Sequence, residues 1–89
     1  MNAIVTVIGQ DRVGIIAAIC AKLASFNINI LDISQTILHG SFTMVMAVDI
    51  EKATDPLEEL SRSLAELGEE MNLSIRIQRE DIFNAMHTI

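Results

Sequence analysis

Apolar and polar positions recur with changing periods along the chain, and these periods predict six elements in the order strand, helix, strand, strand, helix, strand. Residues 3–8, "AIVTVI", are β-branched and apolar on both faces, which is typical of an internal strand. Residues 13–26 form an Ala- and Ile-rich run. That run is too long for a strand between two turns, so the pattern predicts a helix.

Two strands joined by a tight turn are predicted in the middle of the chain. They cover residues 28–39 and 42–50, and Gly40 and Ser41 are expected to reverse the chain between them. Large apolar residues recur along one face of each strand: Leu31, Ile33 and Ile37 in the first, and Phe42, Met44, Met46, Val48 and Ile50 in the second.

The second helix is predicted from Pro56, at the first helical position, with Asp55 as its N-cap. Leucine and methionine at spacings of three and four predict one buried stripe: Leu57, Leu60, Leu64, Leu67 and Met71. Gly68 would cost this helix up to about 1 kcal/mol relative to Ala unless the helix ends there. Asn72 is a suitable left-handed stop.

A fourth strand is predicted over residues 73–79, followed by a tail over about 80–89 that contains Ile82, Phe83 and Met86 at the spacing of a short amphipathic helix. The order of elements predicts an α+β, ferredoxin-like βαββαβ fold: a four-stranded antiparallel sheet with two helices on one face. Right-handed crossovers place strands 3–8 and 42–50 in the centre. We expect a single domain over residues 1–89, with about 80–89 as a C-terminal extension.

Composition narrows the function classes. The chain has 89 residues, 51% of them hydrophobic, and a formal net charge of −6. This charge argues against binding to nucleic acid or to an anionic membrane surface. The single cysteine, Cys20, has no partner for an internal disulfide, and the sequence shows neither a signal peptide nor a membrane span. A cytoplasmic location is therefore expected.

Several functions that this fold supports would leave marks in the sequence. A metal chaperone would carry two thiols in the first strand-to-helix loop, which here reads "GQDRVG". An RNA-recognition domain would carry aromatic residues on the central strands, where only Phe42 is present. An acylphosphatase-type loop would need more glycines and basic residues. We expect no catalytic residues, no metal and no cofactor, and thus no enzyme.

The stretch "TVIGQDRVGIIAAICAKLASFNINILDISQT" resembles the amino-terminal half of an ACT domain, with its Gly-x-Asp-x-x-Gly-type loop and Asn-Ile step. The patterns "NILDISQTI", "FTM" and "EDIFNAMH" are similar to those of the free-standing bacterial ACT proteins of the UPF0237 family. Related modules occur in the glycine-cleavage regulator and in formyltetrahydrofolate deformylase. Val13 replaces a common Pro, and Gly9 and Asp11 replace the His and Asn of serine-binding ACT domains. The resemblance therefore implies ligand binding without serine specificity.

The first loop has the chemistry to hold an amino acid. The N–H groups of Val13, Gly14 and Ile15, in the predicted first turn of the helix, would bind a carboxylate, and Asp11 would bind the ammonium group. Gly9 would allow a positive φ, and Arg12 is a further candidate. The alternative reading gives Asp11 a helix-capping role and makes Arg12 a solvated charge.

Asn29 is a further candidate, at the other end of the molecule. A helix of about 14 residues spans roughly 21 Å, so Asn29 and Asp11 of one chain cannot hold the same small ligand. An edge strand favours pairing with a second chain. Antiparallel pairing of residues 28–39 across a two-fold axis would bring Asn29 of one chain toward Asp11 of the other. The alternative role for Asn27 and Asn29 is to end a helix.

Two functions follow from these features. The first is a free-standing regulatory protein: a homodimer that binds a small ligand, expected to be an amino acid, at the subunit interface. The alternative is a non-catalytic interaction module that docks on an enzyme or regulator through the same edge and binds no metabolite. Neither function involves nucleic acid or a membrane.

Overall fold

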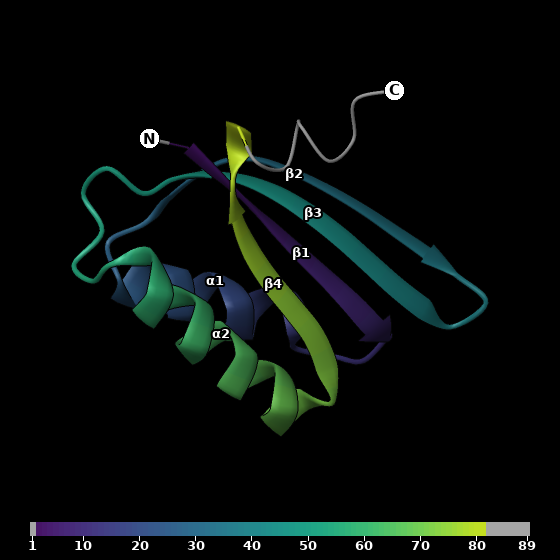
Figure 1. The fold of residues 1–89 in the computed structure, drawn as a ribbon. Coiled ribbons are helices and arrows are strands. Elements are labelled where there is room, and N and C mark those ends of the chain that lie inside the picture. The colour runs from purple at the N-terminus through teal and green to yellow at the C-terminus, as the bar shows by residue number, and fades with distance from the viewer. Residues whose placement is uncertain (1, 82–89) are drawn as a thin grey trace.

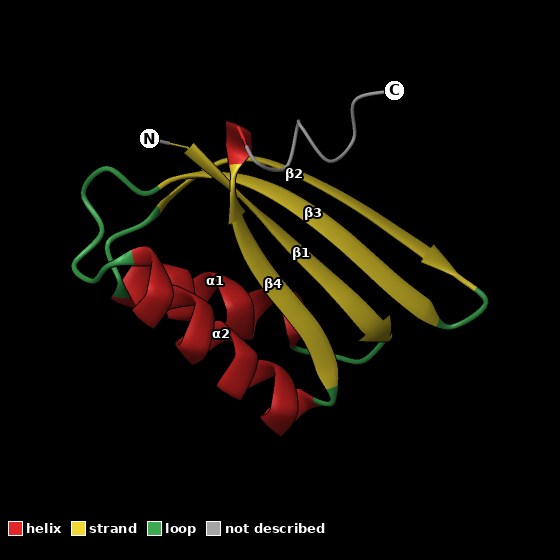
Figure 2. Ribbon diagram, viewed as in Figure 1, coloured by secondary structure: helices red, strands yellow, loops and turns green. Residues whose placement is uncertain are grey.

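The computed structural model describes residues 2–81, and these form the predicted order of elements. The strands and helices are β1 (Asn2–Gln10), α1 (Ile15–Ser25), β2 (Asn29–Leu38), β3 (Ser41–Asp49), α2 (Leu57–Met71) and β4 (Leu73–Arg79). Both helices lie against one face of a twisted sheet (Figures 1 and 2). The α+β ferredoxin-like prediction is confirmed. The amphipathic helix predicted from Ile82, Phe83 and Met86 lies outside the described residues.

The sheet has the strand order β2-β3-β1-β4, with every neighbouring pair antiparallel. β1 and β3 therefore occupy the centre and β2 and β4 the edges, as the right-handed crossovers predict. At one end of the sheet, Asp49 of β3 pairs with Asn2 of β1 on one side and with Asn29 of β2 on the other. Gln10 lies at the opposite end, where β1 leads into α1.

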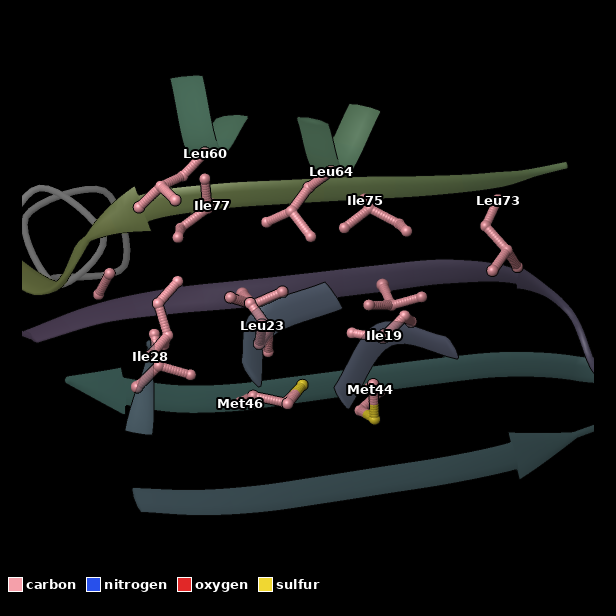
Figure 3. Close-up of a cluster of buried hydrophobic side chains, with 14 of the residues drawn as sticks. Ile19, Leu23, Ile28, Met44, Met46, Leu60, Leu64, Leu73, Ile75 and Ile77 are labelled. Atoms are coloured by element: carbon pink, nitrogen blue, oxygen red, sulfur yellow. The ribbon is translucent and has the colours of Figure 1, made fainter. Parts of the chain in front are cut away.

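The core lies between the helices and the sheet (Figure 3). Alternate residues of β1 and β3 point toward the helices, and this side of β3 is almost fully buried, with Met44 and Met46 at 0% exposure. Ile19 and Leu23 of α1 and Leu60 and Leu64 of α2 fill the space above them. The predicted stripe of α2 is confirmed, with Leu57, Leu67 and Met71 partly buried at its margins.

Both helices begin later than the sequence predicts. α1 begins at Ile15, because Gly14 adopts a left-handed conformation that ends the loop rather than starting the helix. α2 begins at Leu57, and Pro56 is the N-cap with an extended ψ of 160°. Within residues 2–81, no side chain forms a capping hydrogen bond at either helix start, so the prediction of Asp55 as the N-cap is wrong.

The ends of the elements are made by residues with positive φ. Asn72 ends α2 with φ 59° and ψ 45°, which confirms it as a left-handed stop. Asn27 has φ 60° at the end of α1. The turn between β2 and β3 is formed by His39 and Gly40, both with positive φ, one residue earlier than predicted. This pair of conformations suits the twist of a tight hairpin.

β2 contains a bulge near its start, where the register with β3 passes from Ile30 to Asp32 and skips Leu31. Beyond the bulge, Ile33 and Ile37 pair with Met46 and Phe42 and therefore lie on the helix side. They are nevertheless 41% and 54% exposed. The helices thus leave the outer margin of the sheet, along β2, largely uncovered.

The polar residues of β2 lie on the other face of the sheet. Asp32, Ser34 and Thr36 pair with residues of β3 that point away from the helices, and all three are exposed. These side chains therefore form a polar, solvent-exposed stripe on that face.

Candidate functional site

The loop between β1 and α1 is held against the hairpin turn. The backbone N–H of Asp11 donates to the carbonyl oxygen of Gly40 at 2.8 Å. This bond connects the loop with the β2–β3 turn, which is distant in sequence. The side chain of Asp11 is exposed at the same place.

Gly14 fixes where α1 starts. Its φ of 91° and ψ of 0° lie in the left-handed region, which an L-residue with a side chain rarely adopts. A Cβ at this position would meet no atom within 4 Å, so the requirement for glycine comes from the backbone alone. The N–H of Ala18 donates to the carbonyl oxygen of Gly14 at 2.9 Å, which starts the ladder of the helix.

The N–H groups without an acceptor at the start of α1 lie two residues later in the chain than the predicted set that began at Val13. Because the ladder begins at Ala18, the N–H groups of Ile15, Ile16 and Ala17 have no acceptor inside the helix. The first turn of α1 carries no acidic residue. Ile15 lies in this first turn, whereas Val13 precedes the helix, so a donor role of Val13 would come from the loop and stays a prediction.

A hollow of about 230 Å³ lies at this end of the molecule. Its lining comes from the loop, the first turn of α1 and the two neighbouring strands: Asp11, Arg12, Gly14, Ile15, Ile16, Ala17, Gln35, Ile37 and Phe42. Phe42 is buried and forms part of the apolar lining, while Asp11 and Arg12 bring charges of opposite sign. The hollow thus combines a carboxylate, a guanidinium, amide donors and an apolar surface.

Gly9 does not have the role that the sequence suggested. It lies inside β1, paired with Phe42 and Leu73, and positive φ occurs at two other glycines of the described chain, Gly14 and Gly40. A Cβ on Gly9 would meet the Leu73 side chain and would lie 3.3 Å from the Leu73 Cα. Gly9 therefore allows β4 to pack closely, and it does not line the hollow.

Arg12 is not simply a solvated charge. Its Nη1 donates to the carbonyl oxygen of Met71 at 3.3 Å, at the carboxyl end of α2. A cation at this position is favourable for the helix dipole and binds a carbonyl that has no partner within the helix. Arg12 thus joins the loop to the end of the second helix while its side chain also borders the hollow.

Asn29 lies in a different hollow, at the opposite end of the sheet. This second hollow measures about 400 Å³ and is lined by Ala24, Asn27, Ile28, Asn29, Asp49 and Lys52. The side chain of Asn27 donates to the carbonyl oxygen of Lys52 at 2.9 Å, which gives Asn27 a structural role. Asn29 is exposed. Within one chain, the structure brings Asp11, Arg12, Gly14 and Ile15 together and keeps Asn29 apart from them.

Gln35 and Ile37 line the hollow but were not candidates. Beyond the bulge at Leu31, the residues of β2 that pair with Met44 and Phe42 are Gln35 and Ile37, so these two side chains point toward α1. A polar Gln between Ile33 and Ile37 was the only sequence signal, and alternation alone could not place it beside the loop.

Metal binding and membrane insertion find no support in the part of the chain that the structure covers. Among residues 2–81, no three His, Cys, Asp or Glu side chains are grouped closely enough to hold a metal ion. None of the described helices is long and apolar enough to cross a membrane.

The fold and this loop define the class of protein. The model of the ACT domain family matches residues 2–78, and the chain belongs to this family. Domains of this family are often regulatory modules that bind small ligands. Within it the chain is a UPF0237 protein: it is 53% identical to the UPF0237 protein of Listeria monocytogenes over 89 residues, which is 100% of both chains.

Solved structures agree with this assignment. An ACT domain protein from Streptococcus pneumoniae is 38% identical, with a TM-score of 0.82 over 93% of each chain. A formyltetrahydrofolate deformylase from Pseudomonas syringae is 28% identical with a TM-score of 0.77. That match covers 88% of this chain but only 27% of the deformylase. The likeness to the deformylase therefore concerns one part of a larger enzyme.

Proposed function

We propose that this protein is a free-standing, non-catalytic regulator of the cytoplasm, a homodimer that binds an amino acid at each of two equivalent sites between its subunits. The observation that carries the proposal is the hollow at the start of α1. It places the exposed Asp11 carboxylate beside helix N–H groups that have no acceptor within the helix. A free amino acid carries the complementary pair of charges on neighbouring atoms. An ammonium group suits Asp11, and a carboxylate suits the amino end of α1.

The size and lining of the hollow support a small ligand. About 230 Å³ is below the range of about 300–1,000 Å³ for sites that hold drug-sized molecules. The apolar walls of Ile37 and Phe42 would take a short aliphatic side chain, and the amide of Gln35 is the one uncharged polar side chain among the lining residues.

The edge strand β2 supports the dimer. It exposes large apolar residues over most of its length: Leu31, Ile33, Ile37 and Leu38. Antiparallel pairing of β2 with its two-fold mate near Ile33 would bring the start of β2 in one subunit, with Asn29, toward the end of β2 in the other, beside the hollow. Asn29 would then complete the hollow that one chain leaves open, so each site would take residues from both subunits.

A thermal-shift screen of the purified full chain against the twenty amino acids and folate-pathway metabolites tests this function. Binding to the folded state alone stabilises a protein by about 2.7 kcal/mol at a hundredfold excess over Kd. For a domain of this size, that corresponds to a rise in Tm of roughly 10–20 °C. The rise should disappear in Asp11→Ala and persist in Glu66→Ala, which removes the same charge from an exposed position on α2.

The alternative function is a docking module that uses the exposed edge of β2 to bind an enzyme or regulator and takes no metabolite. A well-folded dimer that responds to none of these compounds would favour that function. A protein that is monomeric at micromolar concentration would contradict the interfacial site under either function.

A further inference from the structure

The second edge of the sheet, at β4, is more regular than the edge at β2. Within residues 2–81, no strand lies beyond β4 in the order β2-β3-β1-β4. β4 pairs with β1 residue by residue from Leu73 to Arg79 without a bulge, whereas the register of β2 skips Leu31. Every second residue of an edge strand directs its backbone N–H and C=O groups away from the sheet. From Leu73 to Ile77, β4 therefore offers a straight row of donors and acceptors on its outer side.

A groove of about 460 Å³ lies along this edge, between β4 and α2. Its wall on α2 is formed by Ser61, Ala65 and Glu69. These three residues are four positions apart, so they lie in one row along the helix. All three are exposed, and the first two have small side chains. The helix therefore leaves space beside β4 for the side chains of an added strand.

The floor of the groove is apolar. Three lining residues of β4 point toward α2 and keep a small exposed area: Leu73 at 9%, Ile75 at 6% and Ile77 at 7%. The corresponding residues of the neighbouring strand β1, Val5 and Val7, are at 0%. Because α2 and β4 run in opposite directions (Figure 1), Glu69 lies at the Leu73 end of the groove.

The charges on α2 are predominantly negative. This helix of 15 residues carries five glutamates and one arginine, Arg62, which forms an ion pair with Glu59. Glu69 lines the groove, and Glu66 lies on the neighbouring exposed row of the helix. The groove therefore favours a segment with positive charge.

The same charges argue against a second copy of this chain as the occupant. Antiparallel pairing of two β4 strands across a two-fold axis would continue the sheet and keep all helices on one face. The two acidic α2 helices would then lie side by side, within the distance over which charges interact at physiological salt. Like charges at that distance oppose association.

We propose that the α2–β4 groove binds an extended, basic segment of a partner protein, which adds to the sheet as a fifth strand beside β4. Seven residues at about 3.4 Å each span roughly 24 Å, so a segment of about seven residues would pair with the whole of β4. Backbone hydrogen bonds to β4 would supply affinity. Side chains on the helix side would pass Ser61 and Ala65, and lysine or arginine there would reach Glu66 and Glu69.

This surface is separate from the proposed ligand site. No residue lines both the groove and the hollow at the start of α1. The β2 edge also stays available to a second subunit. The proposal therefore stands whether or not the protein binds an amino acid, and a thermal-shift screen without a hit does not affect it.

Titration of a synthetic peptide into the isotope-labelled full chain, followed by the amide chemical shifts, tests the proposal. The probe is a peptide of about seven residues in which lysine alternates with valine and threonine. We expect saturable shift changes in β4 and along the row from Ser61 to Glu69, and none in β2. Two control peptides should cause no such changes: one with glutamate in place of lysine, and one with proline in place of valine, which cannot pair as a strand.

Each other result of this titration would overturn the proposal. Shift changes in β2 would place the peptide at the other edge. Equal binding of the glutamate peptide would remove the role of charge, and equal binding of the proline peptide would remove the added strand. The absence of saturable changes with the lysine peptide would show that the groove takes no such segment.

A matched pair of variants locates the charge that matters. Glu69→Lys should raise the Kd of the lysine peptide at least about threefold. Glu51→Lys makes the same change at an exposed position of the β3–α2 loop and should leave the Kd unchanged. Ala65→Trp fills the groove and should abolish the saturable changes. Equal effects of Glu69→Lys and Glu51→Lys would contradict binding in the groove, and the titration of the unmodified chain decides the question even if Ala65→Trp fails to fold.

Discussion

The carbonyl oxygen of Leu73 lies so close to Gly68 that a Cβ on Gly68 would be only 2.5 Å from it. Gly68 is inside α2, which continues to Met71, and it is buried. The glycine therefore does not mark the end of the helix. It lets the first residue of β4 pass directly over the last turns of α2, which sets how closely this helix lies on the sheet.

Gly68→Ala is therefore expected to destabilise the protein although Ala favours helices. The gain in helix propensity is up to about 1 kcal/mol, but forcing a methyl group against backbone costs about 1–3 kcal/mol. We expect a net loss of about 1–2 kcal/mol in the free energy of unfolding, measured by urea denaturation. Glu70→Ala, at an exposed position of the same helix, should change it by less than about 0.5 kcal/mol. A Gly68→Ala protein as stable as the parent would contradict this close approach.

Gly14→Ala should also destabilise, for a different reason. There is space for a methyl group, but φ of 91° is unfavourable for an L-residue by about 1–2 kcal/mol. Gly14→Asn should lose less, because Asn tolerates left-handed conformations better than Ala. Thermal unfolding of the two variants gives the comparison. An Ala variant that unfolds at the same temperature as the Asn variant would show that the loop relaxes to negative φ.

Dimer formation should depend on the apolar edge of β2. Ile33→Lys places a charge at the centre of the proposed pairing, where the two copies of the residue would meet, and like charges facing each other oppose association. We expect the dimer Kd measured by sedimentation velocity to rise at least about tenfold. The matched control is Ile8→Lys, which introduces the same charge at a 52% exposed position on the other face and should leave Kd unchanged.

The shared ligand site predicts complementation between two inactive variants. Asp11→Ala and Asn29→Ala should each lose binding of the amino acid found in the thermal-shift screen. Mixing the two proteins and allowing subunits to exchange forms heterodimers with one site free of both substitutions. With random exchange, about a quarter of the sites should bind again, as counted by titration calorimetry.

Binding that stays absent after demonstrated subunit exchange would mean that Asp11 and Asn29 do not act at one site. The dimer itself would stand in that case, because the sedimentation experiment tests it separately.

The order of elements could be predicted because it depends on the period and the length of each apolar pattern. No single residue changes either of these. Strand pairing followed from the handedness of the crossovers. The stripe from Leu57 to Met71 located the buried face of α2 for the same reason.

The wrong predictions concern positions where the residue type fits more than one backbone conformation. Gly14 and Pro56 both stood at positions compatible with the first turn of a helix, and only the positive φ of Gly14 and the extended ψ of Pro56 place them outside it. At Gly9, a close approach by Leu73 and a positive φ would both favour glycine, and the sequence cannot distinguish them.

The candidate site was predicted in part. The loop residues Asp11 and Gly14 were found because their chemistry and spacing are local. Gln35 was missed because alternation places it on the face of Ile33 and Ile37 but does not show that the helices leave this face open beside the loop. The contact between Arg12 and Met71 joins residues 59 positions apart in the chain, and the sequence around each residue does not indicate it.

The bulge in β2 affects how several copies of the chain can assemble through this edge. Leu31 is the residue that the register with β3 skips, so a chain lacking it would keep every other pair in β2 aligned, whereas a deletion after Asp32 would turn the remaining side chains over. The extra residue also bends the strand locally. This leaves only the straight length from Asp32 to Leu38 as a template for another strand. An edge interrupted in this way can pair with the edge of one other chain, but it is a poor template for a sheet that extends through many chains.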